Sequence, residues 1–300
     1  MLTQPKVCVV ISCFNHEKFV IEALQSVQKQ SYPNIEIVII DDCSSDQSQN
    51  VIAEYLSTNT SLTFLKNKTN LGITKSFNQI LSFVKADYII DLAADDLLLP
   101  HCIEQQINAY LKLDLEKYFA VYGNCEVINQ NGDHLNYYYP VDTDIKVLNK
   151  PFNEGAYLDV LSQKYKLCSV SALMNFKIFK ELGGYDENLV YEDLDYWIRA
   201  SRKYKVKFID AILVQKRILP KSLYQSSLEN SNFSRKINYS TYLILKKAYI
   251  QNNLKEENKA LRKRIKNEIS KNIRNRDFKL VYHLNILKIK SFFIAFESNT

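Results

Sequence analysis

Short apolar runs alternate with amphipathic stretches along the first hundred residues of the chain. Four runs rich in β-branched residues are typical of strands buried on both faces, and they lie at 7–12, 35–40, 62–65 and 88–90. The stretches between them repeat apolar residues at helical spacing, which predicts helices over 17–30, 51–56 and 73–84. Strands that alternate with helices through short links form a parallel sheet with right-handed crossovers. This part of the pattern predicts an α/β fold with a mostly parallel central sheet flanked by helices.

The pattern changes in the second half of the chain. Two apolar runs, 125–128 and 134–138, flank Asn131-Gly132, and Asn-Gly between two such runs predicts a hairpin. Further strands are expected at 119–122 and 206–213, and a helix is expected at 191–204. From Phe233 onward the residues form long helical stretches rich in Lys, Arg, Asn and Leu. We therefore expect a body over residues 1–225 and a basic helical C-terminal extension over residues 226–300.

Two pairs of adjacent carboxylates follow predicted strands. Asp41-Asp42 comes directly after the second strand, and Asp95-Asp96 comes after the fourth. The carboxyl ends of parallel strands meet at one edge of a sheet, so both pairs are expected to face one cleft. Neighbouring carboxylates repel each other unless a cation lies beside them, which indicates Mg²⁺ or Mn²⁺ and a nucleotide diphosphate. The alternative is that these residues are acidic N-caps of two helices.

A third acidic pair, Glu192-Asp193, stands at the start of the predicted helix 191–204. A carboxylate there could act as a general base if it reaches a substrate hydroxyl, or it could only complement the helix dipole. We expect Tyr196 and Trp197 on the same helix to pack in the core. The chain lacks the G-x-G-x-x-G and G-x-x-x-x-G-K-[ST] motifs and has six glycines in all, so phosphates would be held by metal and side chains.

Composition and charge narrow the class of protein. With 46% hydrophobic and 24% charged residues, the chain is typical of a soluble globular protein, and no run approaches the roughly 18 apolar residues of a membrane span. The six cysteines lack C-x-x-C spacing and are expected to be reduced thiols in a cytoplasmic protein. From Arg235 to Lys290 there are 16 Lys and Arg against 4 Asp and Glu, within a net charge of +6. This basic surface could meet anionic lipid, nucleic acid or an acidic acceptor.

The segment 291–296, SFFIAF, follows basic helical turns and could lie on a membrane surface. Peripheral contact with the inner face of the membrane is therefore one expectation for the tail. A solvated, charge-rich helical face is the other.

Four segments in order resemble the successive signatures of glycosyltransferase family 2, which are inverting enzymes of the GT-A fold. They are VVISCFNHEKFVIEALQSVQKQSYPNIEIVIIDDCSSDQS, NLGITKSFN, YIIDLAADDLLLP and FKELGGYDENLVYEDLDYWIRAS, and together they cover about residues 5–215. The resemblance implies a GT-A catalytic domain over residues 1–225. It also implies a bacterial enzyme of polysaccharide or lipopolysaccharide synthesis that uses a nucleotide-sugar donor.

The resemblance implies roles for the acidic pairs on the donor side. Asp41 and Asp42 match the pair that contacts uracil and ribose, and Phe14 and Asn15 match the loop beneath the base. Asp95 and Asp96 match the D-x-D-type metal motif, with Asp96 as the direct metal ligand and Asp95 as its neighbour facing the donor.

On the acceptor side, Asp193 matches the catalytic base of the family, with Glu192 beside it. Two positions depart from the pattern. Ala93 stands where many members carry a further Asp of the metal motif, and Lys75 stands where an Arg is common. Metal geometry is the property that the departure at Ala93 affects.

The expected function is metal-dependent, inverting transfer of a sugar from a UDP-sugar to a hydroxyl of a saccharide or lipid-linked acceptor. A sugar-phosphate nucleotidyltransferase is an alternative, but it would carry a glycine-rich loop where Phe14-Asn15-His16 stands. A nucleic-acid-binding protein is a second alternative, but aromatic and basic residues are little interleaved in the tail. We expect no nucleic-acid partner.

Overall fold

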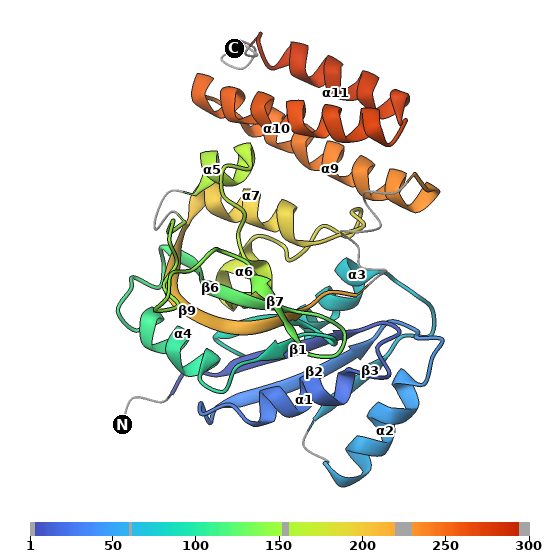
Figure 1. The fold of residues 1–300 in the computed structure, drawn as a ribbon, viewed down its shortest axis with the longest axis vertical. Helices are drawn as coiled ribbons and strands as arrows, with labels where there is room; N and C mark the ends of the chain where they lie inside the picture. Colours follow the sequence, from blue (N-terminus) through green and yellow to red (C-terminus); the bar gives the residue numbers. More distant parts are fainter. Residues whose placement is uncertain (1–3, 60–61, 152–155, 220–229, 294–300) are drawn as a thin grey trace.

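A nine-stranded sheet lies at the centre of the computed structural model, which describes residues 4–59, 62–151, 156–219 and 230–293 (Figure 1). The strand order is β3-β2-β1-β4-β8-β6-β9-β5, and β7 pairs with β6. The first four strands in this order are parallel, and β6 and β9 are parallel to each other. The strands are β1 (Val7–Cys13), β2 (Ile35–Asp41), β3 (Thr63–Lys66), β4 (Tyr88–Ala93), β5 (Leu97–Leu98), β6 (Tyr118–Ile128), β7 (His134–Tyr137), β8 (Leu173–Asn175) and β9 (Lys205–Arg217).

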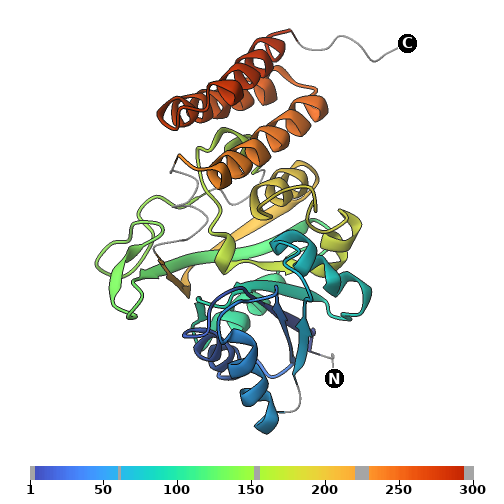
Figure 2. The same cartoon turned by 90° about the vertical axis from the view of Figure 1, so that its right-hand side faces the viewer.

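Helices cover the sheet and extend the molecule at one end (Figures 1 and 2). The helices of the body are α1 (Val20–Gln28), α2 (Ser48–Thr58), α3 (Ile73–Asn78), α4 (Cys102–Tyr110), α5 (Tyr157–Ser162), α6 (Phe176–Glu181) and α7 (Asp193–Lys203). Two short 3₁₀ turns are η1 (Gln79–Ser82) and η2 (Ser169–Ser171). The last three helices are α9 (Asn232–Gln251), α10 (Lys255–Arg274) and α11 (Phe278–Lys290). The predicted architecture, a mostly parallel sheet with flanking helices and a helical C-terminal part, is confirmed.

Strand positions agree with the apolar runs more closely than helix ends agree with the periodicity. The first helix begins only at Val20 because the carbonyl of His16 accepts the N–H groups of Phe19 and Val20 in a preceding turn. The second helix begins earlier than predicted, at Ser48, whose N–H donates to the Asp46 carboxylate at 2.9 Å. The third helix ends at Asn78 and continues as the turn η1. The predicted hairpin forms, with Ile128 opposite His134.

An aromatic cluster joins α7 to the sheet. Tyr196 is fully buried, and its ring lies 6.0 Å from that of Phe119 and 5.1 Å from that of Phe179. Trp197 is 5% exposed and packs on Phe119 at 5.7 Å. The expected packing role of Tyr196 and Trp197 is confirmed, and all six cysteines are free thiols. This cluster fixes the helix whose first turn carries the third acidic pair.

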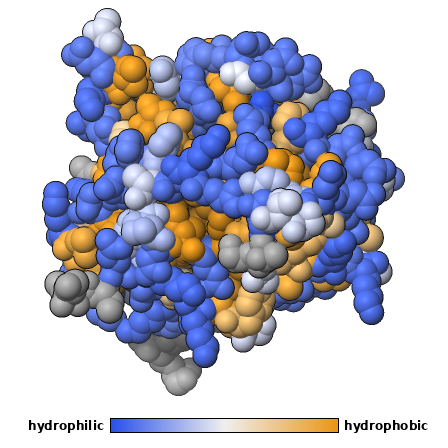
Figure 3. Space-filling model, turned by 90° about the horizontal axis from the view of Figure 1, so that it is seen from below, coloured by the Kyte–Doolittle hydropathy of each residue, from blue (hydrophilic) through white to orange (hydrophobic). Residues whose placement is uncertain are grey.

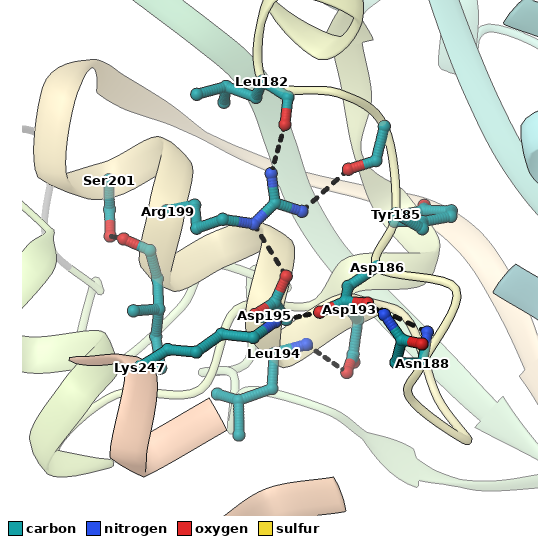
Figure 4. A network of polar contacts seen from close by, with 12 residues as sticks. Leu182, Tyr185, Asp186, Asn188, Asp193, Leu194, Asp195, Arg199, Ser201 and Lys247 are labelled. Atoms are coloured by element: carbon teal, nitrogen blue, oxygen red, sulfur yellow. Dashed lines mark hydrogen bonds and ion pairs between the residues drawn. The ribbon is translucent and has the colours of Figure 1, made fainter. Parts of the chain in front are cut away.

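The three C-terminal helices stack on α5 and α7 at the end of the molecule away from α1 and α2 (Figures 1 and 2). Lys247 of α9 forms ion pairs with Asp186 and with Asp195 of α7 (Figure 4). Arg199 pairs with the other carboxylate oxygen of Asp195. These contacts connect the extension to the loop and helix beside the acidic pair. The predicted domain boundary at residue 225 lies outside the described residues and stays a prediction.

The opposite face, seen from below, is mostly hydrophilic, with apolar side chains gathered toward its middle (Figure 3). In the described part of the chain, no helix combines the length and the apolar character that crossing a bilayer requires.

Candidate active site

The register of the parallel strands brings the first two acidic pairs to one edge of the sheet. Cys13 at the end of β1 lies beside Asp41 of β2, and Ser12 lies beside Ala93 of β4. Asp41-Asp42 and Asp95-Asp96 therefore leave the sheet on either side of the end of β1. The expectation that both pairs lie at one edge is confirmed.

The Asp41 carboxylate is fully buried and organises the loop that follows β2. It accepts hydrogen bonds from the Ser44 N–H at 3.0 Å, the Ser44 hydroxyl at 2.5 Å and the Gln49 amide at 2.6 Å. Contact with a nucleotide would add to these three hydrogen bonds, since a carboxylate can accept about four. In the present arrangement, Asp41 positions the loop.

The Asp42 carboxylate ties a second loop to the same edge. It accepts hydrogen bonds from the side chain of Asn67 at 2.9 Å and from the N–H groups of Leu71 and Gly72 at 2.8 Å each. Asp42 is 7% exposed. The two acidic residues thus hold two loops, 43–46 and 67–72, around the end of β2.

The loop after β1 joins this assembly through Asn15, which adopts a left-handed conformation with φ of 59°. Asn is among the few non-glycine residues that tolerate this region. The Asn15 N–H donates to the Ser44 hydroxyl, and its side-chain oxygen accepts the Ser45 N–H, each at 2.8 Å. The neighbouring Phe14 ring is 46% exposed. An exposed aromatic ring on a fixed loop is suited to stacking against a planar base.

Asp96 is buried, 2% exposed, in the turn between β4 and β5. Its Oδ1 accepts the backbone N–H of Arg217 at 2.8 Å, and no described residue donates a hydrogen bond to Oδ2. Burial, and next the negative charge of Asp95, raises the pKa of Asp96 to about 8. Asp95 lies beside it, with the His16 ring nitrogen 3.9 Å from its carboxylate.

The buried Arg217 side chain holds this turn in place. Its guanidinium donates to the carbonyl of Asp95 at 3.1 Å and to the carbonyls of Asn129 and Gln130 at 3.3 and 3.2 Å. It also forms an ion pair with Glu22 of α1 at 2.8 Å. Sequence reasoning missed Arg217, whose partners come from three separate segments of the chain.

The third acidic pair lies at the start of α7. The Asp193 carboxylate accepts the N–H of Leu194 at 2.6 Å and the hydroxyl of Ser169 at 3.2 Å. One oxygen of Glu192 is buried without a hydrogen-bond partner among the described residues. Burial, with the charges of Asp193 and Asp91, raises the pKa of Glu192 well above its usual range.

Asp91 is a buried carboxyl that sequence reasoning missed. It lies on β4, where Tyr185 donates to one oxygen at 3.0 Å and Ser12 donates to the other at 3.2 Å. Burial is the largest effect and raises the pKa of Asp91 to about 7, and the charge of Asp193 adds to this. In the sequence, Asp91 could have been noticed because it ends the apolar run YIID of a buried strand. Asp91, Glu192 and Asp193 are close enough that their charges interact.

Lys216 is the third residue that sequence reasoning missed. It lies on β9 next to Arg217, and its charge acts on both Asp96 and Asp193. These two acidic residues, which the sequence placed on different elements, therefore both interact electrostatically with one cation. In the sequence, Lys216 could have been noticed because it belongs to the polar residues QKR that follow the apolar run AILV at the end of β9.

The predicted binding of Mg²⁺ or Mn²⁺ depends on the carboxylates around Asp96. Among the described residues, no group of three or more His, Cys, Asp and Glu side chains is arranged to hold a metal ion. Mg²⁺ is, however, commonly bound through one or two carboxylates together with substrate phosphates and water. The free Oδ2 of Asp96 fits that mode, so the residues present are compatible with a cation that binds together with the donor.

Comparisons with known proteins give the class of the protein. The family model described as glycosyl transferase family 2 matches residues 8–183. An uncharacterized glycosyltransferase of Methanocaldococcus jannaschii is 28% identical over 258 residues, which are 84% of this chain and 84% of that protein. One from Rickettsia felis is 30% identical over 244 residues, 80% of this chain but only 38% of that protein.

Solved structures give the fold. TarS of S. aureus, residues 1–349 in complex with UDP-GlcNAc, has a TM-score of 0.65 at 16% identity and covers 96% of this chain and 89% of its own. The mannosyltransferase PcManGT of Pyrobaculum calidifontis, in complex with GDP-Man and Mn²⁺, has a TM-score of 0.59 at 13% identity and covers 99% and 89%.

The α/β architecture with its acidic strand ends is thus the GT-A fold of a glycosyltransferase. More particularly, the chain belongs to glycosyl transferase family 2. The protein is a glycosyltransferase, and this decides against the nucleotidyltransferase alternative.

Proposed function

We propose that this glycosyltransferase moves a sugar from a nucleotide-diphosphate donor, with a UDP-sugar as the first candidate, to a hydroxyl of a saccharide or lipid-linked acceptor. The observation that carries the proposal is the cluster of Asp96, Lys216 and Asp193 at the edge of the sheet: the turn of Asp96 is hydrogen-bonded to the end of β9, and the charge of Lys216 acts on both carboxylates. This cluster brings a residue suited to a donor phosphate and a residue suited to an acceptor hydroxyl into one place. The complexes of TarS with UDP-GlcNAc and of PcManGT with GDP-Man support the donor class.

The donor side is assigned to the loops at the ends of β1 and β2. Phe14 supplies an exposed ring for the base, and Asn15 fixes the loop that carries it. Asp41 and Asp42 hold the surrounding loops and are the proposed contacts to base and ribose. Asp95 faces the donor, and Asp96 is the proposed ligand of Mg²⁺ or Mn²⁺.

The acceptor side is assigned to Asp193. In the proposed step, the acceptor oxygen bonds to the anomeric carbon while the bond from that carbon to the phosphate oxygen breaks. The electron pair leaves with the phosphate oxygen, and the hydroxyl proton goes to Asp193. A single displacement inverts the anomeric centre. Glu192 lies beside the base, and one of its oxygens is buried without a hydrogen-bond partner among the described residues.

A divalent cation, when bound, would stabilise the negative charge that develops on the leaving diphosphate. Asp96 would hold it through the oxygen that Arg217 leaves free. The Mn²⁺ recorded with PcManGT supports this assignment. That this glycosyltransferase acts in polysaccharide synthesis is part of the same proposal.

The test is release of nucleoside diphosphate from a panel of UDP- and GDP-sugars, with Mg²⁺ or Mn²⁺ and after chelation. Asp193→Asn should slow transfer by at least about 100-fold, because the general base is lost, and should leave donor binding intact. Asp144→Asn, on an exposed loop, is the matched control. Near-normal turnover of Asp193→Asn would remove Asp193 from the base role, and no turnover by the wild type with any donor would contradict the proposed function.

We also propose peripheral contact with an anionic membrane through α11. This helix buries Leu280, Leu284 and Leu287 against the rest of the extension. Its outward face nevertheless carries three large apolar side chains that are 58–67% exposed, namely Phe278, Tyr282 and Ile289, and Phe293 just beyond its end is 74% exposed. The three on the helix recur at helical spacing, and together with Phe293 we call them the stripe, which suits the interface of a bilayer. Of the tail segment 291–296, residues 294–296 lie outside the described chain.

Charge selects the kind of membrane. Within residues 230–293, Glu256 is the one exposed acidic residue, whereas exposed Lys and Arg occur on all three helices. A basic surface around an apolar stripe favours anionic lipid. The protein should therefore sediment with vesicles that contain phosphatidylglycerol and less with pure phosphatidylcholine vesicles.

Replacing the four stripe residues with Ser should reduce sedimentation, whereas Ile250→Ser with Leu254→Ser, exposed elsewhere on the extension, should not. Equal loss in both variants would overturn the assignment of the stripe. A stripe variant that still sediments but no longer self-associates in size-exclusion chromatography would assign this face to a second copy instead.

A further inference from the structure

The turn that holds Asp96 lies next to the end of β9. Strands β5 and β9 pair antiparallel with Leu97 opposite Gln215 and Leu98 opposite Val214. One step further along this register, Lys216 comes level with Asp96. The hydrogen bond from the Arg217 N–H to Asp96 at 2.8 Å confirms the close approach of the two segments.

Neighbouring side chains of a strand point to opposite faces of the sheet. The Arg217 side chain lies on the face of α1, where it pairs with Glu22. Lys216 is therefore directed to the other face, which it shares with Cys125, because Cys125 pairs with Val214 two residues away. Lys216 is half-buried there, and its charge acts on Asp96 and Asp193.

No described carboxylate forms an ion pair with Lys216 within 4.0 Å. Its ammonium group thus interacts electrostatically with Asp96 and Asp193 without forming an ion pair with a carboxylate in the described part of the chain. A half-buried cation between a proposed phosphate site and a proposed general base has the position and the charge to contact a phosphate oxygen. A lysine ammonium is a compact point charge that serves this purpose in many phosphate sites.

We propose that Lys216 is a donor-binding residue whose ammonium group contacts the diphosphate of the nucleotide sugar beside the cation held by Asp96. This inference rests on the proposed function, since it requires a nucleotide-diphosphate donor. It also assigns a reason to the small residue at position 93. With Ala93 in place of a further carboxylate, the site has fewer acidic ligands for metal, and Lys216 supplies part of the positive charge.

The test compares binding of UDP and GDP with binding of uridine and guanosine by titration calorimetry. Lys216→Met should weaken binding of the diphosphate that the wild type prefers by about tenfold or more, and should leave binding of its nucleoside unchanged. Lys216→Arg should recover most of the loss because the charge is retained. Lys207→Met, on the same strand but away from Asp96, is the matched control.

Binding of Mn²⁺ in the presence of saturating diphosphate gives a second readout. Removal of a neighbouring cation should leave Mn²⁺ affinity unchanged or increase it, whereas a disrupted site would lose Mn²⁺ and nucleoside together. Unchanged diphosphate binding in Lys216→Met, or equal weakening of nucleoside and diphosphate, would overturn the role of Lys216 alone. A wild-type protein that binds neither diphosphate would instead overturn the proposed function and this inference with it.

Discussion

Arg217 offers the sharpest test of how the Asp95-Asp96 turn is held. In Arg217→Met, the methionine can replace the aliphatic stem but none of the polar contacts. Three carbonyl oxygens, those of Asp95, Asn129 and Gln130, lose a charged donor at 3.1–3.3 Å. The side chain is only 2% exposed, so water does not readily replace the guanidinium.

The magnitude follows from the separate contributions. Glu22 is 55% exposed, so the ion pair itself contributes at most about 1 kcal/mol. Hydrogen bonds from a charged donor contribute about 1.5–3 kcal/mol each when isolated, but three that share one guanidinium are not additive. We therefore expect the free energy of unfolding to fall by about 3 kcal/mol, and Tm to fall by about 6 °C in a chain of this size.

The assay is urea unfolding of Arg217→Met followed by circular dichroism, with Glu22→Gln as the control. The control removes only the exposed ion pair, so it should cost no more than about 1 kcal/mol. If the two variants lose the same stability, the carbonyl contacts of Arg217 contribute nothing measurable and the reasoning is refuted.

Two further predictions concern the buried acid and a glycine turn. The pKa of Asp91 is raised to about 7 in the folded protein. Between pH 4 and pH 7, Asp91 therefore keeps a proton in the folded protein that it releases in the unfolded chain. As pH rises through this window, the contribution of Asp91 to the free energy of unfolding of the wild type falls. Asp91→Asn should therefore unfold like the wild type at pH 4 but be about 2–4 kcal/mol more stable at pH 8, measured by urea unfolding; parallel pH profiles would contradict this. Gly183 and Gly184 both have positive φ, 79° and 69°, but only at Gly184 would a Cβ lie 2.6 Å from the Asn78 side chain. Gly184→Ala should thus lower the free energy of unfolding by about 2 kcal/mol more than Gly183→Ala in the same assay, and equal losses would show that Asn78 moves freely.

The parts of the fold that could be predicted are those that local sequence determines. Strands buried on both faces form unbroken apolar runs, so β1, β2 and β4 were visible. The long strand β6 was predicted as two separate runs because Gly123 interrupts its apolar pattern. A Cβ at Gly123 would lie 2.7 Å from the carbonyl of Ala211, so the glycine permits close approach of β9 and is not a break. That contact joins segments almost 90 residues apart and leaves no periodic signal.

The candidate site divides in the same way. Acidic pairs at strand ends were found because their position on the strands implies a shared edge, which the register confirms. Asp91, Lys216 and Arg217 were missed because their importance depends on which side of the sheet each side chain occupies. Their partners come from other elements, such as Tyr185 for Asp91 and Glu22 for Arg217. Their roles follow only once the sheet is assembled.

The assembled charges give a physical reason for the proposed pairing of a metal ion with Lys216. Burial and the charge of Asp95 disfavour ionisation of Asp96, and Glu192 is disfavoured in the same way by Asp193 and Asp91. A metal ion requires Asp96 in its ionised form, and ionised Asp96 would repel a doubly charged diphosphate unless positive charge compensated for it. A metal ion held by one carboxylate binds firmly only together with the phosphates. Lys216 is present before the donor arrives, so it can offset the repulsion at first contact, while the metal ion acts once donor and protein ligands are combined.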